Sequence, residues 1–252
     1  MVVIVACGLW LGYYVVDSQH QKQTYETLAE DFFLEEPAPS LSLEDNSSGE
    51  SSAAGGTVVT LTTAPPRHDL VALQAENPDC VGWLTIPDTS VDYPVVWTPE
   101  KPEHYLRRDF YGNHASGGTP FLDGRNQARA EGQNLILYGH NMLDGSMFKP
   151  VLQYLTPNFQ VTHEDIYLEL DGIQYHYQVI AALETSTRSP VYAYTDLSDS
   201  TEMEDFRSML LEETSLDAIP QAEGYLTLST CNNQGGNSRV LVVAVLVGKQ
   251  EI

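Results

Sequence analysis

Hydrophobic and polar positions divide the 252-residue chain into three stretches. The first, Val2–Val16, is apolar and has no charged residue. The second, residues 17–66, is polar and becomes rich in Ser, Gly, Thr and Pro from residue 37 onward. In the third, residues 67–252, short apolar runs alternate with turn-forming residues, which is typical of a domain rich in β-strands. We therefore expect one folded domain that follows an apolar segment and a linker.

The apolar segment predicts a membrane anchor over residues 1–16. As a helix it would measure about 22 Å, less than a hydrocarbon core of about 30 Å, but its aromatic residues suit the interfacial region of a membrane. Three alternatives stay open. A signal peptide would need a basic region before the run and a small-residue cleavage site after it, and neither is seen. A buried helix fits poorly with the acidic sequence that follows. Ile4–Cys7 weakly resembles a lipoprotein cleavage site, but the apolar run continues past Cys7.

Residues 17–66 are predicted to form an acidic stalk between the anchor and the domain. They contain nine acidic residues and one basic residue. Asp17–Glu36 is predicted to be helical, with a thin apolar stripe of Leu28, Phe32 and Phe33. The remainder of the stretch has the composition of a flexible tether.

The folded domain is predicted to be mainly β. Asp171-Gly172 joins two alternating runs over Ile166–Leu183 and predicts a hairpin with a type I′ turn. Helices are predicted around Leu70–Leu73 and over Asp199–Glu213, where apolar residues recur every three or four positions. Further strands are predicted at Val81–Pro87, Val91–Val96, Asn134–Tyr138, Gly224–Ser229 and Val240–Val247. Such a set of strands with few helices predicts a β-barrel or a β-sandwich.

The charge and the cysteines narrow the possible partners. The 35 Asp and Glu residues against 12 Lys and Arg give a formal charge of −23, which argues against binding to nucleic acid and against adsorption to an anionic membrane surface. Cys7, Cys80 and Cys231 lie far apart without a CxxC pair, so we expect neither a zinc site of paired cysteines nor a disulfide framework. The histidines show no metal-ligand spacing. We expect no metal and no cofactor.

Cys231 and Arg239 are the first candidates for chemistry. Cys231 ends a strand-like run, a polar Gly-rich loop follows it, and Arg239 begins the next run. If these runs pair as a hairpin, the thiol and the guanidinium face each other across its open end. A nearby cation favours the nucleophilic thiolate, and the same guanidinium can hydrogen-bond an oxyanion. A buried structural cysteine beside a surface arginine remains the alternative.

His140 favours the catalytic interpretation. It follows the predicted buried strand Asn134–Tyr138, and strand ends that lead into loops commonly display catalytic groups. A cysteine nucleophile needs a group that takes up and returns a proton, for which imidazole is suited. Sequence spacing does not show whether His140 and Cys231 meet in space.

Taken together, these residues resemble the class B sortases, a family of cysteine transpeptidases. The matching segments are Leu228–Cys231 (LSTC) followed by Arg239, Tyr138–Met142 (YGHNM), Gly145–Phe148 (GSMF), Asn77–Leu84, Asp92–Val96 and Gly118–Asp123. The predicted helix over Asp199–Glu213 resembles the extra helix that class B members carry before the cysteine strand. The resemblance covers residues 67–248, which is the whole predicted domain.

The resemblance implies a fold and a mechanism. Residues 67–252 would form a closed eight-stranded β-barrel with peripheral helices. Cys231 would attack the Thr carbonyl of a C-terminal sorting signal of the LPxTG or NPxTx type and form a thioacyl intermediate. His140 would act as general acid and then as general base. Arg239 would orient the substrate and stabilise the oxyanion.

The resemblance also implies partners and a location. Ser229, Thr230 and Asn141 would bind the sorting-signal peptide, and an amine from a peptidoglycan precursor or a pilin lysine would resolve the intermediate. The enzyme would cross the membrane of a Gram-positive bacterium once, with its N-terminus inside and its catalytic domain outside. Anchoring of surface proteins and pilus polymerisation stay open as functions. So do a hydrolytic cysteine peptidase on the same residues and a surface-binding barrel without activity.

Overall fold

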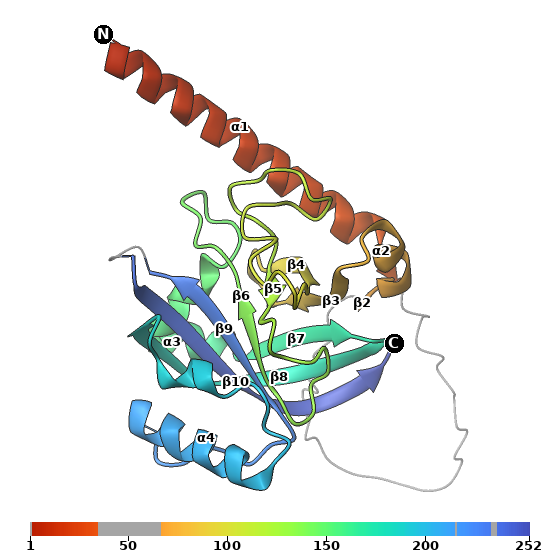
Figure 1. Cartoon of the computed structure of the whole chain (residues 1–252), viewed down its shortest axis with the longest axis vertical. Helices are drawn as coiled ribbons and strands as arrows, with labels where there is room; N and C mark the ends of the chain where they lie inside the picture. The colour runs from red at the N-terminus through yellow and green to blue at the C-terminus, as the bar shows by residue number, and fades with distance from the viewer. Residues whose placement is uncertain (1, 35–66, 215, 233–235) are drawn as a thin grey trace, which may run out of the picture.

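Eight strands close into a β-barrel in this computed structural model, which describes residues 2–34, 67–214, 216–232 and 236–252 (Figure 1). Around the barrel the strands follow the order β10-β8-β7-β3-β4-β5-β6-β9. Their bounds are β3 Cys80–Thr85, β4 Asp92–Val96, β5 Phe121–Leu122, β6 Asn134–Tyr138, β7 Asp165–Leu170, β8 Ile173–Ser186, β9 Tyr225–Cys231 and β10 Ser238–Glu251. The predicted closed eight-stranded barrel is confirmed.

Strand pairing explains how the barrel is built. β7 and β8 form the predicted hairpin, in which Asp171 and Gly172 have φ values of 48° and 75°, the left-handed conformations that a type I′ turn requires. β10 pairs with β8 on one side and with β9 on the other, both antiparallel. β6 and β9 are parallel neighbours, although a long stretch of sequence separates them. This parallel pair decides the position of the site described below.

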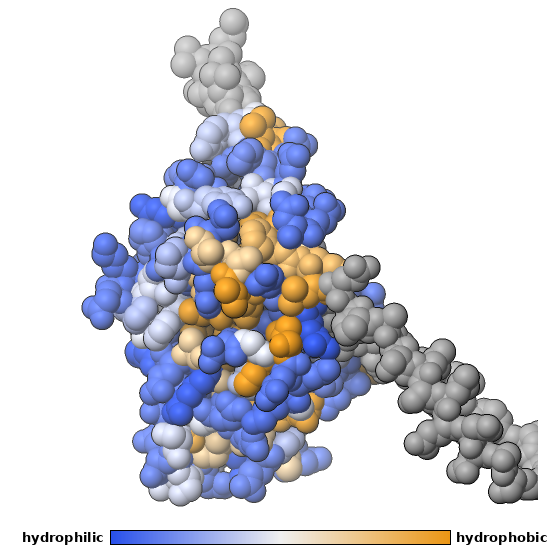
Figure 2. All heavy atoms as spheres, turned by 90° about the vertical axis from the view of Figure 1, so that its right-hand side faces the viewer, coloured by the Kyte–Doolittle hydropathy of each residue, from blue (hydrophilic) through white to orange (hydrophobic). Residues whose placement is uncertain are grey.

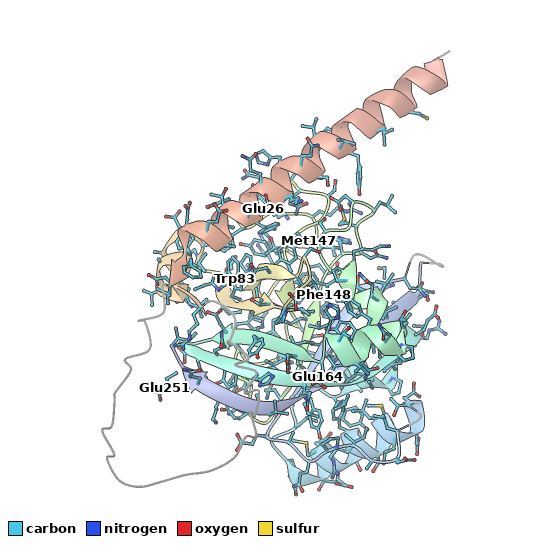
Figure 3. All side chains as sticks on the ribbon, turned by 180° about the vertical axis from the view of Figure 1, so that it is seen from behind. Glu26, Trp83, Met147, Phe148, Glu164 and Glu251 are labelled. Carbon is cyan, nitrogen blue, oxygen red and sulfur yellow. The ribbon has the colours of Figure 1, made fainter. Side chains whose placement is uncertain are left out.

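The barrel interior and one outer face form the core. Trp83 on β3 is fully buried (Figure 3). Cys80 is also buried, and this burial raises the pKa of its thiol to about 12, so it packs as a small apolar residue. On the outside, helix α4 (Ser200–Glu213) packs Phe206 and Leu210 against a second cluster that includes residues of β8, β9 and β10. The predicted helix before the cysteine strand is therefore confirmed.

Smaller helices connect the strands. Asp69 caps α2 (Leu70–Glu76) by accepting a hydrogen bond from the Ala72 N–H at 2.9 Å, the usual role of a side chain before the first helical turn. The others are η1 (Pro150–Leu155), α3 (Pro157–Thr162) and η2 (Pro190–Ala193). On the side where α2 lies, a group of apolar residues interrupts a mainly hydrophilic surface (Figure 2).

The first helix, α1, runs without interruption from Val2 to Asp31 and crosses one end of the barrel (Figure 1). Its second half is part of the fold, because Ser18, Gln21, Tyr25 and Leu28 are buried against the domain. The predicted stalk does not include this packing. Ser18 and Gln21 are polar, so the pattern of apolar residues does not predict their burial, and they are buried because they hydrogen-bond to the domain. None of the helices in the described part of the chain is both long and apolar enough to cross a membrane.

The ends of the remaining stalk lie side by side. β1 (Phe33–Leu34) pairs antiparallel with β2 (Arg67–His68), and residues 35–66 between them lie outside the described residues. His68 holds β2 on the barrel, because its backbone N–H and its ring Nδ1 each lie 2.9 Å from a carboxylate oxygen of the buried Glu169. Its ring also stacks on Trp83 with a centroid distance of 3.9 Å.

Candidate active site

The hairpin of β9 and β10 places Cys231 opposite Arg239, as its sequence predicts. The two residues are direct partners in the antiparallel register. Cys231 is the last residue of β9 and is half-buried, so its thiol is reachable from solvent. The short distance along the chain between these strands is what made this pairing predictable.

The parallel pairing of β6 with β9 brings His140 to the same end of the barrel. Tyr138 is the register partner of Ser229, so the residues two positions further on, His140 and Cys231, leave neighbouring strand ends together. Two hydrogen bonds continue the pairing: the Gly139 N–H donates to the Ser229 carbonyl at 3.2 Å, and Thr230 Oγ1 donates to the Gly139 carbonyl at 2.8 Å. The structure thus supplies the spatial link that spacing alone does not show.

A cavity of about 450 Å³ opens at this end of the barrel. It brings together all three predicted catalytic residues, His140, Cys231 and Arg239. The other lining residues are Pro102, Glu103, Leu106, Phe121, Asp123, Gly124, Tyr138, Gly139, Thr187, Tyr192, Ser229 and Thr230. A cavity that contains a cysteine, a histidine and an arginine is equipped for nucleophilic acyl transfer.

A hydrogen bond of the His140 ring shows which of its two nitrogens carries the hydrogen. Its Nε2 lies 2.8 Å from the Leu106 carbonyl oxygen, and because a carbonyl only accepts, the hydrogen of this bond is on Nε2. In the neutral ring Nδ1 is then the basic nitrogen. Burial lowers the pKa of His140, the charges of Arg107 and Arg239 lower it further, and the hydrogen bond to Leu106 opposes them. The ring is therefore neutral over a wider pH range than a free imidazole and can accept a proton at Nδ1.

Arg239 is held at the rim of the cavity by its own loop. Its Nη1 donates to the Ser238 carbonyl at 2.9 Å and to the Gly236 carbonyl at 3.3 Å. These bonds use one nitrogen of the guanidinium, which has five N–H donors in all. The remaining donors can serve a ligand, because the residue is only half-buried and lines the cavity.

The predicted peptide-binding residues fall into two groups. Ser229 and Thr230 line the cavity, although both are 2% exposed. Asn141 is not among the lining residues, and its side-chain amide donates to the Cys231 carbonyl at 2.9 Å. Asn141 therefore ties the loop that carries His140 to the end of the cysteine strand, and peptide binding by it stays a prediction.

Aromatic residues form a wall of the cavity that the sequence did not predict. Tyr138 stacks on Phe121 with centroids 5.3 Å apart and on Tyr192 with centroids 6.2 Å apart. The Tyr138 hydroxyl donates to Asp123 at 2.8 Å, and the Tyr192 hydroxyl shares a 2.8 Å hydrogen bond with Ser229. Tyr138 could have been noticed as the residue before Gly139-His140. Tyr192 carries no sequence signal, because it comes from η2, which reaches the cavity only in the folded chain.

Comparisons with known proteins agree with this geometry. A family model described as the sortase domain matches residues 84–247. Sortase B of Listeria monocytogenes is 34% identical over 188 residues, which cover 73% of this chain and 76% of the relative. Sortase B of Staphylococcus aureus is 31% identical over 191 residues, which cover 72% and 75%.

Solved structures show the same fold. A Staphylococcus aureus sortase B–substrate complex superposes with a TM-score of 0.63 at 30% identity and covers 71% of this chain and 84% of that one. A Bacillus anthracis sortase B in complex with AAEK1 gives a TM-score of 0.61 at 32% identity, with 70% and 82% covered.

The barrel, the cavity with its cysteine and these matches place the chain in the sortase family of cysteine transpeptidases. Its similarity to sortase B proteins over most of the domain, together with helix α4, makes it a class B sortase.

Proposed function

We propose that this class B sortase cleaves a C-terminal sorting signal of the LPxTG or NPxTx type after its Thr and transfers the protein to an amine of the cell wall. The observation that carries the proposal is that His140, Cys231 and Arg239 line one cavity at the ends of β6, β9 and β10. Each is held by main-chain contacts in a position that suits its role.

The first half of the reaction forms a thioester. Cys231 Sγ attacks the Thr carbonyl carbon while the thiol proton passes to His140 Nδ1, and Arg239 hydrogen-bonds the oxyanion that develops. The C–N bond of the signal then breaks. His140 gives its proton to the departing amine, which leaves the Thr acyl group on the sulfur and a neutral imidazole.

The second half transfers the acyl group. An amine attacks the thioester carbonyl, His140 accepts the proton that this amine loses, and the C–S bond breaks. The proton returns to the sulfur, and the enzyme is regenerated with a new amide bond formed. The known sortase B complexes with a substrate and with triglycine, a peptide with a free amine, support a peptide donor and an amine acceptor here.

The aromatic wall supports an extended peptide as the donor. Phe121, Tyr138 and Tyr192 line the cavity as a stacked row, and aromatic side chains offer apolar surface for the proline ring and the apolar side chain of a short motif. Ser229 and Thr230, from β9, would contact the peptide next to the scissile bond.

We also propose that residues 1–16 attach the enzyme to the membrane, with the N-terminus inside and the catalytic domain outside. The uncharged apolar sequence of Val2–Val16 supports this location. Fractionation of the full chain and of a variant that begins at Asp17 tests it. Equal distribution of both proteins would contradict the proposed attachment.

A panel of sorting peptides tests the proposed reaction. LPxTG, NPxTx and SPxTG peptides are incubated with the full chain and with Cys231→Ala, with and without triglycine, and analysed by mass spectrometry. We expect an acyl-enzyme with the wild-type protein only, and a ligated product that depends on triglycine. Release of the peptide that no acceptor diverts would support the hydrolytic peptidase instead. No acyl-enzyme with any peptide would contradict the proposed chemistry.

A further inference from the structure

Two buried side chains of α1, Gln21 and Tyr25, lie against one loop, which runs from residue 105 to residue 119. Gln21 Oε1 accepts from the Gly117 N–H at 3.1 Å, and Gln21 Nε2 donates to the Gly118 carbonyl at 2.7 Å. The Tyr25 hydroxyl lies 2.8 Å from both the Gly118 carbonyl and Thr119 Oγ1. Gln21 and Tyr25 are 5% and 2% exposed, so these hydrogen bonds are shielded from water and do not exchange easily with it.

The same loop folds back on itself at the residue that contacts His140. Gly118 has a φ of 62°, and a Cβ added to it would lie 2.5 Å from the Leu106 carbonyl oxygen. The Thr119 N–H donates to the Tyr105 carbonyl at 3.2 Å, and Thr119 Oγ1 donates to the Arg108 carbonyl at 2.9 Å. The segment that α1 holds, residues 117–119, is therefore packed directly against the segment that carries Leu106.

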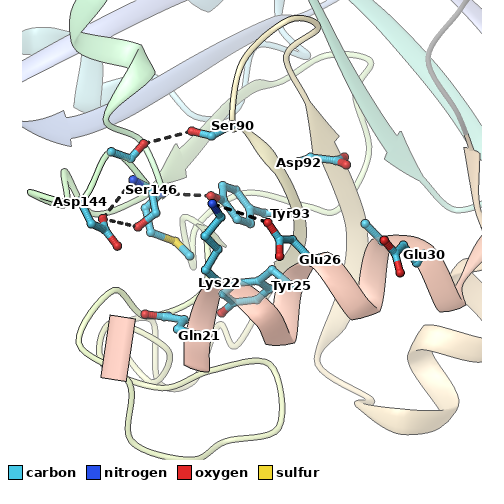
Figure 4. Close-up of a pocket in the computed structure, with 13 residues that line it drawn as sticks. Gln21, Lys22, Tyr25, Glu26, Glu30, Ser90, Asp92, Tyr93, Asp144 and Ser146 are labelled. Carbon is cyan, nitrogen blue, oxygen red and sulfur yellow. Dashed lines mark hydrogen bonds and ion pairs between the residues drawn. The ribbon is translucent and has the colours of Figure 1, made fainter. Parts of the chain in front are cut away.

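The loop that carries His140, residues 139–148, packs less closely against α1 than the 105–119 loop does. A cavity of about 360 Å³ lies between α1 and residues 144–147 (Figure 4), and Ser18 hydrogen-bonds Asp144, one of the residues that line it. On the far side the Tyr93 hydroxyl accepts from the Met147 N–H at 3.0 Å. Apart from this Ser18–Asp144 bond, the buried hydrogen bonds of α1 with the domain go to the 105–119 loop, which also carries the carbonyl that contacts the His140 ring.

We propose that Gln21 and Tyr25 are positioning residues of the transfer reaction: from α1 they hold the 105–119 loop so that the Leu106 carbonyl keeps its hydrogen bond to His140 Nε2. This rests on the proposed role of His140 as the proton carrier. The bond orients the ring and keeps hydrogen on Nε2, which leaves Nδ1 as the base. A loop that moved by about 1 Å would lose this orientation, and displacements of that size reduce turnover by up to about 100-fold.

The direct test is the tautomer of His140, measured by ¹⁵N NMR of the full chain with the signal assigned through His140→Gln. Tyr25→Phe removes a hydroxyl and keeps the ring that packs edge-on against Tyr93 at 5.2 Å. Gln21→Met keeps the length of the side chain without its hydrogen bonds. In the wild-type protein we expect the Nε2–H form. In the double variant we expect a mixture of both tautomers and a fall in kcat of about tenfold with KM unchanged.

Thr27→Ala is the matched control, because Thr27 is exposed on the same helix. It should change neither the tautomer nor kcat. Thermal unfolding of each variant confirms that the compared proteins are folded, and the two single variants provide the comparison if the double variant does not fold. Folded variants with a lower Tm but a wild-type tautomer and kcat would overturn the proposal, because α1 would then only stabilise the fold. Failure of the wild-type protein to form an acyl-enzyme would contradict the proposed function, and the tautomer comparison would still be decisive for Gln21 and Tyr25.

Discussion

Cys231 and His140 line the same cavity, but the structure holds them in different ways. Cys231 ends β9, whose main chain pairs with β10 on one side and with β6 on the other. His140 lies beyond the end of β6, and its ring bonds to a carbonyl of the 105–119 loop. Cys231, the proposed nucleophile, is thus placed by backbone pairing, which depends little on the identity of side chains. The histidine depends on side chains and loops from several parts of the chain.

This difference separates two kinds of substitution. Changes beside Cys231 are expected to act through chemistry while the geometry survives. Changes in the contacts around His140 are expected to act through geometry or through its pKa while the reacting groups survive. The following predictions test that separation, from the largest expected effect on turnover to the smallest.

The largest effect is expected at Arg239. Arg239→Ala removes the proposed donor for the oxyanion and should lower kcat/KM by about 100-fold or more, while Tm stays close to wild type because the residue is half-exposed and is the second residue of β10, next to a loop. Arg239→Lys, which keeps the charge and loses the planar fork, should recover only part of the rate. Peptide ligation and thermal unfolding measure both effects. A near-normal rate for Arg239→Ala would remove it from the mechanism.

An intermediate effect is expected where the cysteine strand meets the histidine loop. Thr230→Val removes the hydrogen bond to the Gly139 carbonyl and should lower kcat by about tenfold. Thr227→Val is the matched control on the same strand, because Thr227 Oγ1 bonds to Asn134 inside the sheet at 2.7 Å. It should cost about 1–3 kcal/mol of stability and leave the kcat of the folded enzyme unchanged. Equal kcat values for the two variants would contradict the separation.

A smaller effect concerns the pKa of His140. Arg107→Ala removes a positive charge that lowers this pKa, so the pKa should rise and the acidic limb of the pH–rate profile should move to higher pH. Activity is lost as the pH falls through the pKa, because the protonated ring cannot accept the thiol proton. Arg108→Ala, next to it and also exposed, is the control and should leave the limb in place. NMR titration of His140 measures both variants, and a downward shift for Arg107→Ala would refute the prediction.

The smallest effect is expected from the segment between β1 and β2. These strands already pair, so a four-residue turn in place of residues 35–66 should leave kcat/KM unchanged. This connection is one eighth as long as the original. It should raise the free energy of unfolding by about 2 kcal/mol, since each halving of a loop lowers the entropic cost of closing it by about 0.6 kcal/mol. Chemical denaturation measures the stability. A loss of turnover would show that residues 35–66 take part in catalysis.

The sequence predicted the fold well where the signal is local. The β7–β8 hairpin, helix α4 and β6 each follow from turn chemistry or periodicity within a short stretch, and the Cys231–Arg239 pair follows from one hairpin. The first helix was only half predicted. The second half of this helix has few apolar residues, and its contact with the barrel uses polar side chains such as Gln21, whose burial depends on partners far along the chain.

The sequence by itself determined the chemistry available to this protein, because the thiol, the imidazole and the guanidinium and their places at strand ends are local properties of the chain. The tertiary structure decided which of them meet. The parallel register of β6 and β9 brings His140 to Cys231, and the folding of residues 105–119 supplies the carbonyl that orients its ring. Both contacts join segments that are distant in sequence and leave no periodic pattern, since a backbone carbonyl or a parallel register is available to any residue type.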